Sequence, residues 1–228
     1  MAAGKACTAV IFDMDGLLLN TEVFYTIVQE QCLRRFGISF TFELKKKMMG
    51  KKALDAAKVL IEETGLQSRL TPEEFLQERE AKLDLLFPTA ELMPGAERLL
   101  WHLHTHSVPF ALATSSHERH YAVKTQRHIE LFSLFSHRVT GDQVARGKPE
   151  PDIFLAAAAG FSPPVPADRC LVFEDAPTGV VAAKAAGMSV VMVPDPQLDA
   201  AEAAQADDVL GSLEDFQPER WGLPPFPA

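Results

Sequence analysis

The 228-residue sequence lacks paired cysteines, an excess of positive charge and any long run of apolar residues. Its three cysteines, Cys7, Cys32 and Cys170, lie far apart and form no CxxC pair, which argues against a disulfide framework and a zinc site. We therefore expect each of them in the core of a protein in a reducing compartment. The formal net charge of -9 repels phosphate backbones, so a nucleic-acid polymer is not an expected partner.

Signals for a membrane or for secretion are also missing from the sequence. No apolar run is long enough to cross a bilayer, and Asp13 and Asp15 interrupt the apolar stretch near Ala9 before it could form a signal peptide. Hydrophobic residues make up 47% of the chain and charged residues 23%, which is typical of a globular protein. We expect a cytoplasmic protein with no membrane partner, and a monomer because no self-association motif stands out.

Short apolar segments that run into polar loops alternate with helical patterns along most of the chain. The predicted strands cover residues 8–12, 109–114, 170–173 and 189–193, with 137–140 as a weaker candidate. The predicted helices between them cover residues 94–106, 152–159 and 177–186. Strand alternating with helix is typical of a doubly wound α/β fold, so we predict a Rossmann-like core with a parallel sheet.

Residues 18–90 break this alternation because they show helical patterns and no clear strand. The predicted helices there cover residues 21–36, 52–64 and 71–87. The last of these opens on Thr71-Pro72-Glu73-Glu74, which is the pattern of a capping box with a first-turn proline. The sequence therefore predicts a helical domain of residues 18–90, inserted after the first strand of a core formed by residues 1–17 and 91–228.

Two pairs of carboxylates each follow a predicted strand. Asp13 and Asp15 come after the first strand, where they could hold Mg²⁺ or supply a nucleophile that attacks phosphorus. Taken alone, this pair is equally well explained as an Asp-rich turn that caps a helix. Glu174 and Asp175 follow another strand, and if the two strands are neighbours, the clustered charges would repel one another without a metal ion. This second pair therefore favours a metal site.

Other polar residues stand where they could contact an anion. Lys148 lies between Gly147 and a proline, which would fix one cation that could neutralise phosphoryl oxygens. The segment Thr114-Ser115-Ser116 ends a predicted strand and offers hydroxyl and backbone N–H groups to phosphate, although the same residues could simply cap a helix. Lys45-Lys46-Lys47 is interpreted as a solvated helix face rather than an anion site.

Four segments in order resemble the four motifs of the haloacid dehalogenase-like hydrolase superfamily. They are DMDGLLLNTE from Asp13, ALATSS from Ala111, GKPEPDIF from Gly147 and VFEDAPTGVVAAKAAGM from Val172. The helical insertion resembles the C1-type cap of that superfamily. Segments outside the motifs, including Met49 to Leu54 and Asp215 to Glu219, are similar to its pseudouridine-5′-phosphatase branch.

The resemblance implies a Mg²⁺-dependent phosphatase that hydrolyses a small phosphorylated metabolite, pseudouridine 5′-phosphate, through an aspartyl-phosphate. Asp13 would be the nucleophile and Asp15 the general acid and base. The implied metal ligands are Asp13, Asp175, the backbone carbonyl of Asp15, and Glu174 directly or through water. The candidates for binding phosphate or substrate are Thr114, Ser115 and Lys148 in the core, and Gly50 and Lys51 in the cap.

Several alternatives remain open at this point. A sugar-phosphate mutase of the β-phosphoglucomutase type shares the motifs, but such mutases carry a histidine in the first cap helix where this chain has Tyr25. A phosphonate hydrolase would need a Schiff-base lysine in the cap, a role that Lys51 leaves open. A broad-specificity phosphatase is a further alternative. A catalytically silent binding module is disfavoured because Asp13, Asp15, Lys148 and Asp175 are all present.

Overall fold

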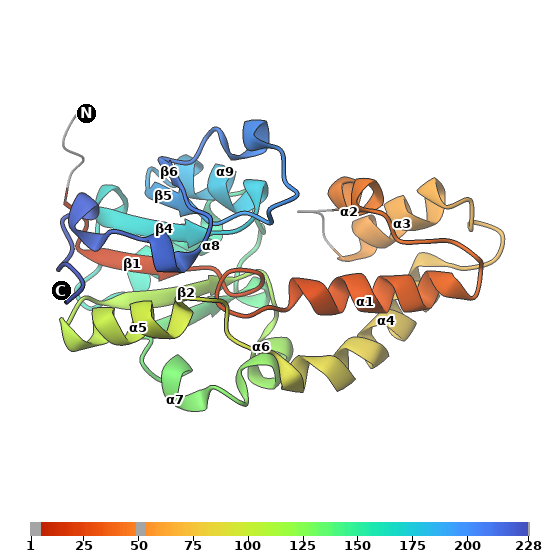
Figure 1. The fold of residues 1–228 in the computed structure, drawn as a ribbon, viewed down its shortest axis with the longest axis horizontal. Helices are drawn as coiled ribbons and strands as arrows, with labels where there is room; N and C mark the ends of the chain where they lie inside the picture. Colours follow the sequence, from red (N-terminus) through yellow and green to blue (C-terminus); the bar gives the residue numbers. More distant parts are fainter. Residues whose placement is uncertain (1–5, 49–52, 228) are drawn as a thin grey trace.

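In the computed structural model, which describes residues 6–48 and 53–227, a parallel sheet has helices on both faces and further helices beyond the carboxyl ends of its strands (Figure 1). The six strands are in the order β3-β2-β1-β4-β5-β6, and every neighbouring pair is parallel. The predicted Rossmann-like sheet is confirmed, and the weaker candidate at residues 137–140 is one of its strands. The strands are β1 (Ala9–Phe12), β2 (Phe110–Thr114), β3 (His137–Thr140), β4 (Cys170–Glu174), β5 (Ser189–Met192) and β6 (Asp208–Val209).

Strand β1 lies at the centre of the sheet and contributes alternate side chains to two cores. Val10 and Phe12 pack on the face covered by α5 (Ala96–Thr105), whereas Ala9 and Ile11 pack on the face covered by α8 (Asp152–Gly160) and α9 (Pro177–Ala185). All four side chains are fully buried. A strand buried on both faces reads as a continuous apolar run, and this is why β1 is easily identified in the sequence.

The shorter elements complete the core around this sheet. Strand β6 was not expected from the sequence, because it has only two residues and its first residue is an aspartate. The shorter helices are α6 (Glu118–Thr125), α7 (Ile129–Phe132), and the 3-10 helices η1 (Phe87–Thr89), η2 (Gly141–Gln143), η3 (Ala167–Arg169), η4 (Ala200–Ala203), η5 (Leu213–Asp215) and η6 (Pro218–Trp221).

Four helices beyond the sheet pack around a hydrophobic cluster of their own. They are α1 (Glu22–Arg34), α2 (Phe42–Met48), α3 (Ala53–Glu63) and α4 (Pro72–Leu86), and we refer to them as the cap. Helix α4 begins with the predicted capping box, because the Thr71 hydroxyl accepts from the Glu74 amide and the Glu74 carboxylate accepts from the Thr71 amide. The expected helices in this part of the chain are therefore confirmed, although α2 was not separately predicted.

The chain enters and leaves the cap along two adjacent segments. The amide of Asn20 donates to the carbonyl of Glu91 at 2.9 Å, and the amide of Met93 donates to the carbonyl of Leu18 at 2.9 Å. Both connections between cap and core therefore run side by side past the end of β1. The division of the chain after residues 17 and 90 stays a prediction.

All three cysteine side chains are buried, as the sequence predicts. Cys7 and Cys170 belong to the cores on the two faces of the sheet, and Cys32 belongs to the cluster inside the cap. Across residues 6–48 and 53–227, none of the helices combines the length and the apolar character that a membrane span requires.

Candidate active site

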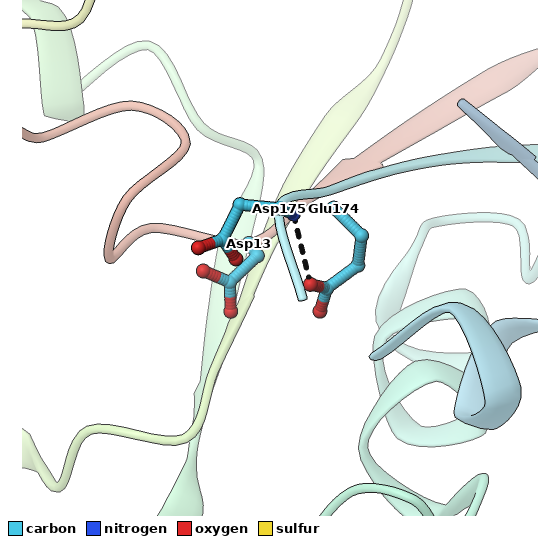
Figure 2. Close-up of side chains that lie close together, drawn as sticks. All are labelled: Asp13, Glu174 and Asp175. Carbon is cyan, nitrogen blue, oxygen red and sulfur yellow. Dashed lines mark hydrogen bonds between the residues drawn. The ribbon is translucent and has the colours of Figure 1, made fainter. Parts of the chain in front are cut away.

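The two predicted acidic pairs meet at one edge of the sheet. Strands β1 and β4 pair in parallel with Phe12 opposite Phe173, so Asp13 emerges beside Glu174 and Asp175. Ligand oxygens of these three carboxylates lie within 4.8 Å of one another, and Figure 2 shows the side chains gathered at the strand ends. The strands that precede the two acidic pairs are therefore neighbours, as a shared metal site requires.

Lys148 supplies positive charge inside this carboxylate cluster. Its ammonium donates to Asp13 Oδ1 at 2.5 Å, to Glu174 Oε1 at 2.5 Å and to the carbonyl of Ala113 at 3.1 Å. The side chain is buried, and all three of its N–H donors have acceptors. Lys148 is therefore held rigidly against Asp13, which is the arrangement expected for a cation that stabilises charge near that carboxylate.

Both carboxylate oxygens of Glu174 accept hydrogen bonds. Its Oε1 atom accepts from Lys148, and its Oε2 atom accepts from the backbone amides of Ala176 at 3.2 Å and Asp175 at 3.1 Å. The dashed line in Figure 2 marks the last of these bonds. Glu174 thus orients Lys148 and fixes the turn that leads into α9. Whether it also binds a metal ion stays a prediction.

The cluster contains more negative than positive charge. Burial raises the pKa of Asp13 to about 7, helped by the neighbouring Glu174 and Asp15 charges and opposed by Lys148. Burial also raises the pKa of Asp175 well above its usual value, together with the charges of Glu174 and Asp13. Carboxylate oxygens are the ligands that Mg²⁺ prefers, and a divalent cation would offset the repulsion, so these residues fit such an ion.

The side chain of Asp15 belongs to a separate hydrogen-bonded group. Its Oδ1 atom accepts from Lys124 Nζ at 2.6 Å and from Thr21 Oγ1 at 2.6 Å. Its Oδ2 atom accepts from Ser116 Oγ at 2.7 Å and, more weakly, from Thr114 Oγ1 at 3.5 Å. Burial alone would raise the pKa of Asp15, but Lys124 and these hydrogen bonds outweigh it and hold the pKa below its usual value.

The other predicted contact residues differ in their positions. Ser115 and Ser116 line a cavity in front of Asp13, whereas Thr114 is fully buried beneath them and its hydroxyl accepts from the Ser116 amide at 3.0 Å. Gly50 and Lys51, the candidate cap residues, lie outside the described residues. Their roles stay predictions.

The interpretation of Lys45 as part of a solvated helix face is wrong. Only 13% of its side chain is exposed, because it lies between Glu22 of the cap at 3.2 Å and Asp195 of the core at 3.4 Å. Lys46 and Lys47 instead pair with glutamates within the cap. Local sequence could not separate the three lysines, because only the docking of the cap onto the core buries the first.

Lys124 is a second residue that sequence reasoning missed. It is fully buried and contacts Asp15, yet it lies 109 positions from that residue in the chain. A single lysine in a short polar helix usually faces solvent, so no local signal marked it.

A cavity of about 530 Å³ extends from the strand ends into the cap. Asp13, Asp15 and Lys148 line its core end, while Tyr25 and Arg79 are among the residues that line it from the cap. The space thus connects the carboxylate cluster with polar side chains of α1 and α4.

Two glycines make room for the acidic side chains. Gly16 has a φ of +79°, and a Cβ atom there would lie 2.3 Å from Asp175 Oδ2. A Cβ atom on Gly179, in α9, would lie 1.9 Å from the carboxyl carbon of Glu174. Both positions therefore require glycine for the carboxylates to occupy their present places.

Comparison with known proteins agrees with this geometry. The family described as haloacid dehalogenase-like hydrolase matches residues 7–187. The chain is 58% identical to (DL)-glycerol-3-phosphatase 2 of Arabidopsis thaliana, over 99% of this chain and 96% of the relative. It is 50% identical to a probable pseudouridine-5′-phosphatase of Drosophila melanogaster, over 97% of this chain and 96% of the relative.

Among solved structures, the chain is similar to a HAD family hydrolase from Deinococcus radiodurans R1 with bound phosphate and sodium. The two share 27% sequence identity with a TM-score of 0.78, and the match covers 96% of this chain and 99% of the other. The similarity therefore extends over both the sheet and the cap.

Replacing Gly179 with alanine tests the close packing of Glu174. We expect Gly179→Ala to displace the Glu174 carboxylate and with it Lys148, lowering phosphatase kcat by at least about tenfold, since small misplacements at a reacting centre are costly. The steady-state rate of phosphate release measures this effect. Val181→Ala, at an exposed site on the same helix, is the control and should remain close to the wild type. Full activity of Gly179→Ala would show that Glu174 need not be held there.

Proposed function

The chain belongs to the haloacid dehalogenase-like hydrolase family and is a phosphoric monoester hydrolase, and on that premise we propose that it acts through an aspartyl-phosphate on Asp13 with Mg²⁺ as its cofactor. One observation carries this proposal. The parallel pairing of β1 with β4 sets Asp13 against Glu174 and Asp175, with Lys148 bonded to Asp13.

Asp13 is the proposed nucleophile. A carboxylate oxygen of Asp13 attacks phosphorus, and the bond from phosphorus to the leaving oxygen breaks as the new bond forms. Lys148, already 2.5 Å from Asp13 Oδ1, stabilises the negative charge on the transferring phosphoryl group. Ser115, which lines the cavity beside these residues, binds a phosphoryl oxygen.

Asp15 is the proposed general acid and base. It donates a proton to the leaving alkoxide, and it then takes a proton from the water that attacks the aspartyl-phosphate. Its proton therefore returns at the end of each turnover. The cavity lies between core and cap, and closure of such a space around the substrate excludes bulk water during both steps.

The residues proposed to hold Mg²⁺ are Asp13, Asp175 and the backbone carbonyl of Asp15. When bound, the ion offsets the negative charge of the carboxylates and of the phosphate group, and this favours the approach of two like-charged groups. Burial, together with the neighbouring carboxylates, raises the pKa of Asp13 to about 7, and this cost of a buried negative charge supports the assignment of a cation there.

Pseudouridine 5′-phosphate is the proposed substrate. Support comes from sequence segments outside the catalytic motifs and from the 50% identity to the relative named as a probable pseudouridine-5′-phosphatase. The cavity of about 530 Å³ leaves room for a leaving group as large as a nucleoside. Gln29 and Arg79 are polar residues among those that line it from the cap, where the leaving group of such a substrate would lie.

Glycerol 3-phosphate is a second candidate substrate. The observation that favours it is the 58% identity to the relative named (DL)-glycerol-3-phosphatase 2. Both candidates are alkyl phosphate monoesters, so the same residues would perform the chemistry. They differ in the size of the leaving group, which the cap side of the cavity would contact. The monomeric state and the cytoplasmic location stay predictions.

The role of Asp13 can be tested by replacing it with asparagine. We expect Asp13→Asn to reduce phosphate release by at least about a thousandfold, because the amide is a poor nucleophile. The fold should persist, and thermal unfolding should not shift downward, since one of several repelling carboxylates is removed. The control is Asn20→Asp, which makes the opposite exchange at an exposed position and should remain active. An active Asp13→Asn chain would exclude the aspartyl-phosphate.

Removal of divalent cations tests the cofactor. After chelation and dialysis, phosphate release should fall by at least about a hundredfold, and added Mg²⁺ should restore it. The melting temperature should also rise with Mg²⁺, because an ion that binds only the folded chain stabilises it, by about 2.7 kcal/mol at a hundred times its Kd. Activity that survives both chelation and dialysis would contradict the Mg²⁺ requirement.

A panel of phosphate esters tests the substrate. We would compare kcat/KM for pseudouridine 5′-phosphate, UMP, glycerol 3-phosphate and β-glucose 1-phosphate, and we expect pseudouridine 5′-phosphate to exceed UMP by at least about tenfold. The highest value for glycerol 3-phosphate would replace the first candidate with the second. Conversion of β-glucose 1-phosphate to glucose 6-phosphate without net phosphate release would indicate a mutase.

A further inference from the structure

A second buried ammonium, that of Lys124 in α6, contacts Asp15, whereas Lys148 contacts Asp13 and Glu174. Lys124 has no measurable exposure. Its Nζ atom donates to Asp15 Oδ1 at 2.6 Å, to Ser116 Oγ at 2.8 Å and to the Tyr25 hydroxyl at 3.1 Å. An ammonium has three N–H donors, and each has found an acceptor.

These contacts restrain both oxygens of Asp15. Lys124 bonds directly to Oδ1, and it also bonds to Ser116, whose hydroxyl in turn donates to Oδ2 at 2.7 Å. Thr21 adds a second donor to Oδ1 at 2.6 Å. The Asp15 carboxylate is therefore held on both sides, and rotation about its side-chain bonds would break several hydrogen bonds at once.

The surroundings of Lys124 join the core to the cap. The ammonium lies 4.3 Å from the ring centre of Phe87 and 5.3 Å from that of Tyr25. It therefore makes cation–π contacts with two aromatic rings in addition to its hydrogen bonds. Tyr25 comes from the first cap helix, and Phe87 begins the return to the core. Asp15 and Ser116 come from the loops after β1 and β2.

A purely structural explanation of Lys124 is weak. Burying a charged pair is costly, and a well-packed apolar residue of similar size is often at least as stabilising. The ammonium contacts no backbone carbonyl of its own helix among the described hydrogen bonds. What this cation adds beyond packing is the orientation of a carboxylate that lines the core end of the cavity.

We propose that Lys124 is a positioning residue that holds Asp15 in the orientation required for proton transfer. This inference rests on the proposed role of Asp15 as general acid and base. In the first step, the bond from Asp13 to phosphorus forms, the bond to the leaving oxygen breaks, and the Asp15 proton passes to that oxygen. In the second step, water forms a bond to phosphorus, the bond to Asp13 breaks, and the water proton passes to Asp15.

The test compares two leaving groups in the Lys124→Met chain. p-Nitrophenolate leaves without being protonated, whereas the alkoxide of glycerol 3-phosphate needs a proton. If Lys124 positions Asp15, the first step with p-nitrophenyl phosphate stays fast and the second becomes slow. Rapid mixing should then show a burst of about one p-nitrophenol per active site, followed by slow turnover. With the alkyl ester, kcat should fall about a hundredfold while KM changes little.

Matched variants separate this role from a general loss of structure. Asp15→Asn should give the same burst and slow turnover, and Lys184→Met, an identical exchange at an ion-paired surface lysine, should behave as the wild type. Wild-type kcat in Lys124→Met, beside slow turnover in Asp15→Asn, would overturn the role of Lys124 and leave the proposed function standing. Wild-type kcat in Asp15→Asn would overturn both.

The size of the burst and a second variant also test the role of Lys124. A burst that shrinks in proportion to the steady-state rate would mean fewer active molecules, and therefore a structural role only. If the Lys124→Met chain does not fold, Tyr25→Phe provides the test, because it removes one acceptor of Lys124 and leaves the ion pair with Asp15 intact. It should show the same burst with a decrease of up to about tenfold in kcat, and unchanged kinetics would contradict the proposal.

Discussion

Parallel pairing of β1 with β4 is the contact on which the rest of the site depends. It aligns two strands from distant parts of the chain so that both end at the same level of the sheet. Asp13, Glu174 and Asp175 then emerge together, because each directly follows or ends one of these strands. The pairing is stabilised by the buried apolar residues of both strands, including the stacked rings of Phe12 and Phe173 with centroids 5.0 Å apart. The apolar core thus holds together carboxylates that repel one another.

Two buried ammonium groups divide the acidic edge into parts with different electrostatics. Lys148 bonds to Asp13 and Glu174, but it is shared between them, and the pKa of Asp13 remains raised by burial and by nearby carboxylates. Lys124 and neighbouring hydroxyl groups donate hydrogen bonds to Asp15, and they lower its pKa in spite of burial. Carboxylates two positions apart in the sequence therefore differ because of residues from other parts of the chain. In the proposed function, the two carboxylates have separate roles, Asp13 as the nucleophile beside a metal site and Asp15 as the group for proton transfer.

The cap contacts the same edge of the sheet through charged and polar pairs. Tyr25 reaches Lys124, Lys45 reaches Asp195, and His120 of the core lies 2.9 Å from Glu80 of the cap. The cavity lies between these two parts, so the groups that contact the leaving part of a substrate come from both.

The sequence by itself determined the sheet, the inserted helices and the four segments that resemble the hydrolase motifs. Continuous apolar strands such as β1, and the capping box at Thr71, are local patterns, because a strand buried on both faces requires a continuous apolar run and helix initiation depends on adjacent residues. Tertiary structure alone decided which side chains the motif residues contact. Lys124 and Lys45 look like ordinary surface lysines in sequence, and only the docking of α6 and of the cap buries them. Thr114 and Ser115 are adjacent in sequence, yet one is buried beneath the loop and the other lines the cavity. The electrostatic state of each carboxylate depends on distances between residues far apart in the chain, and these distances are set by packing rather than by local pattern.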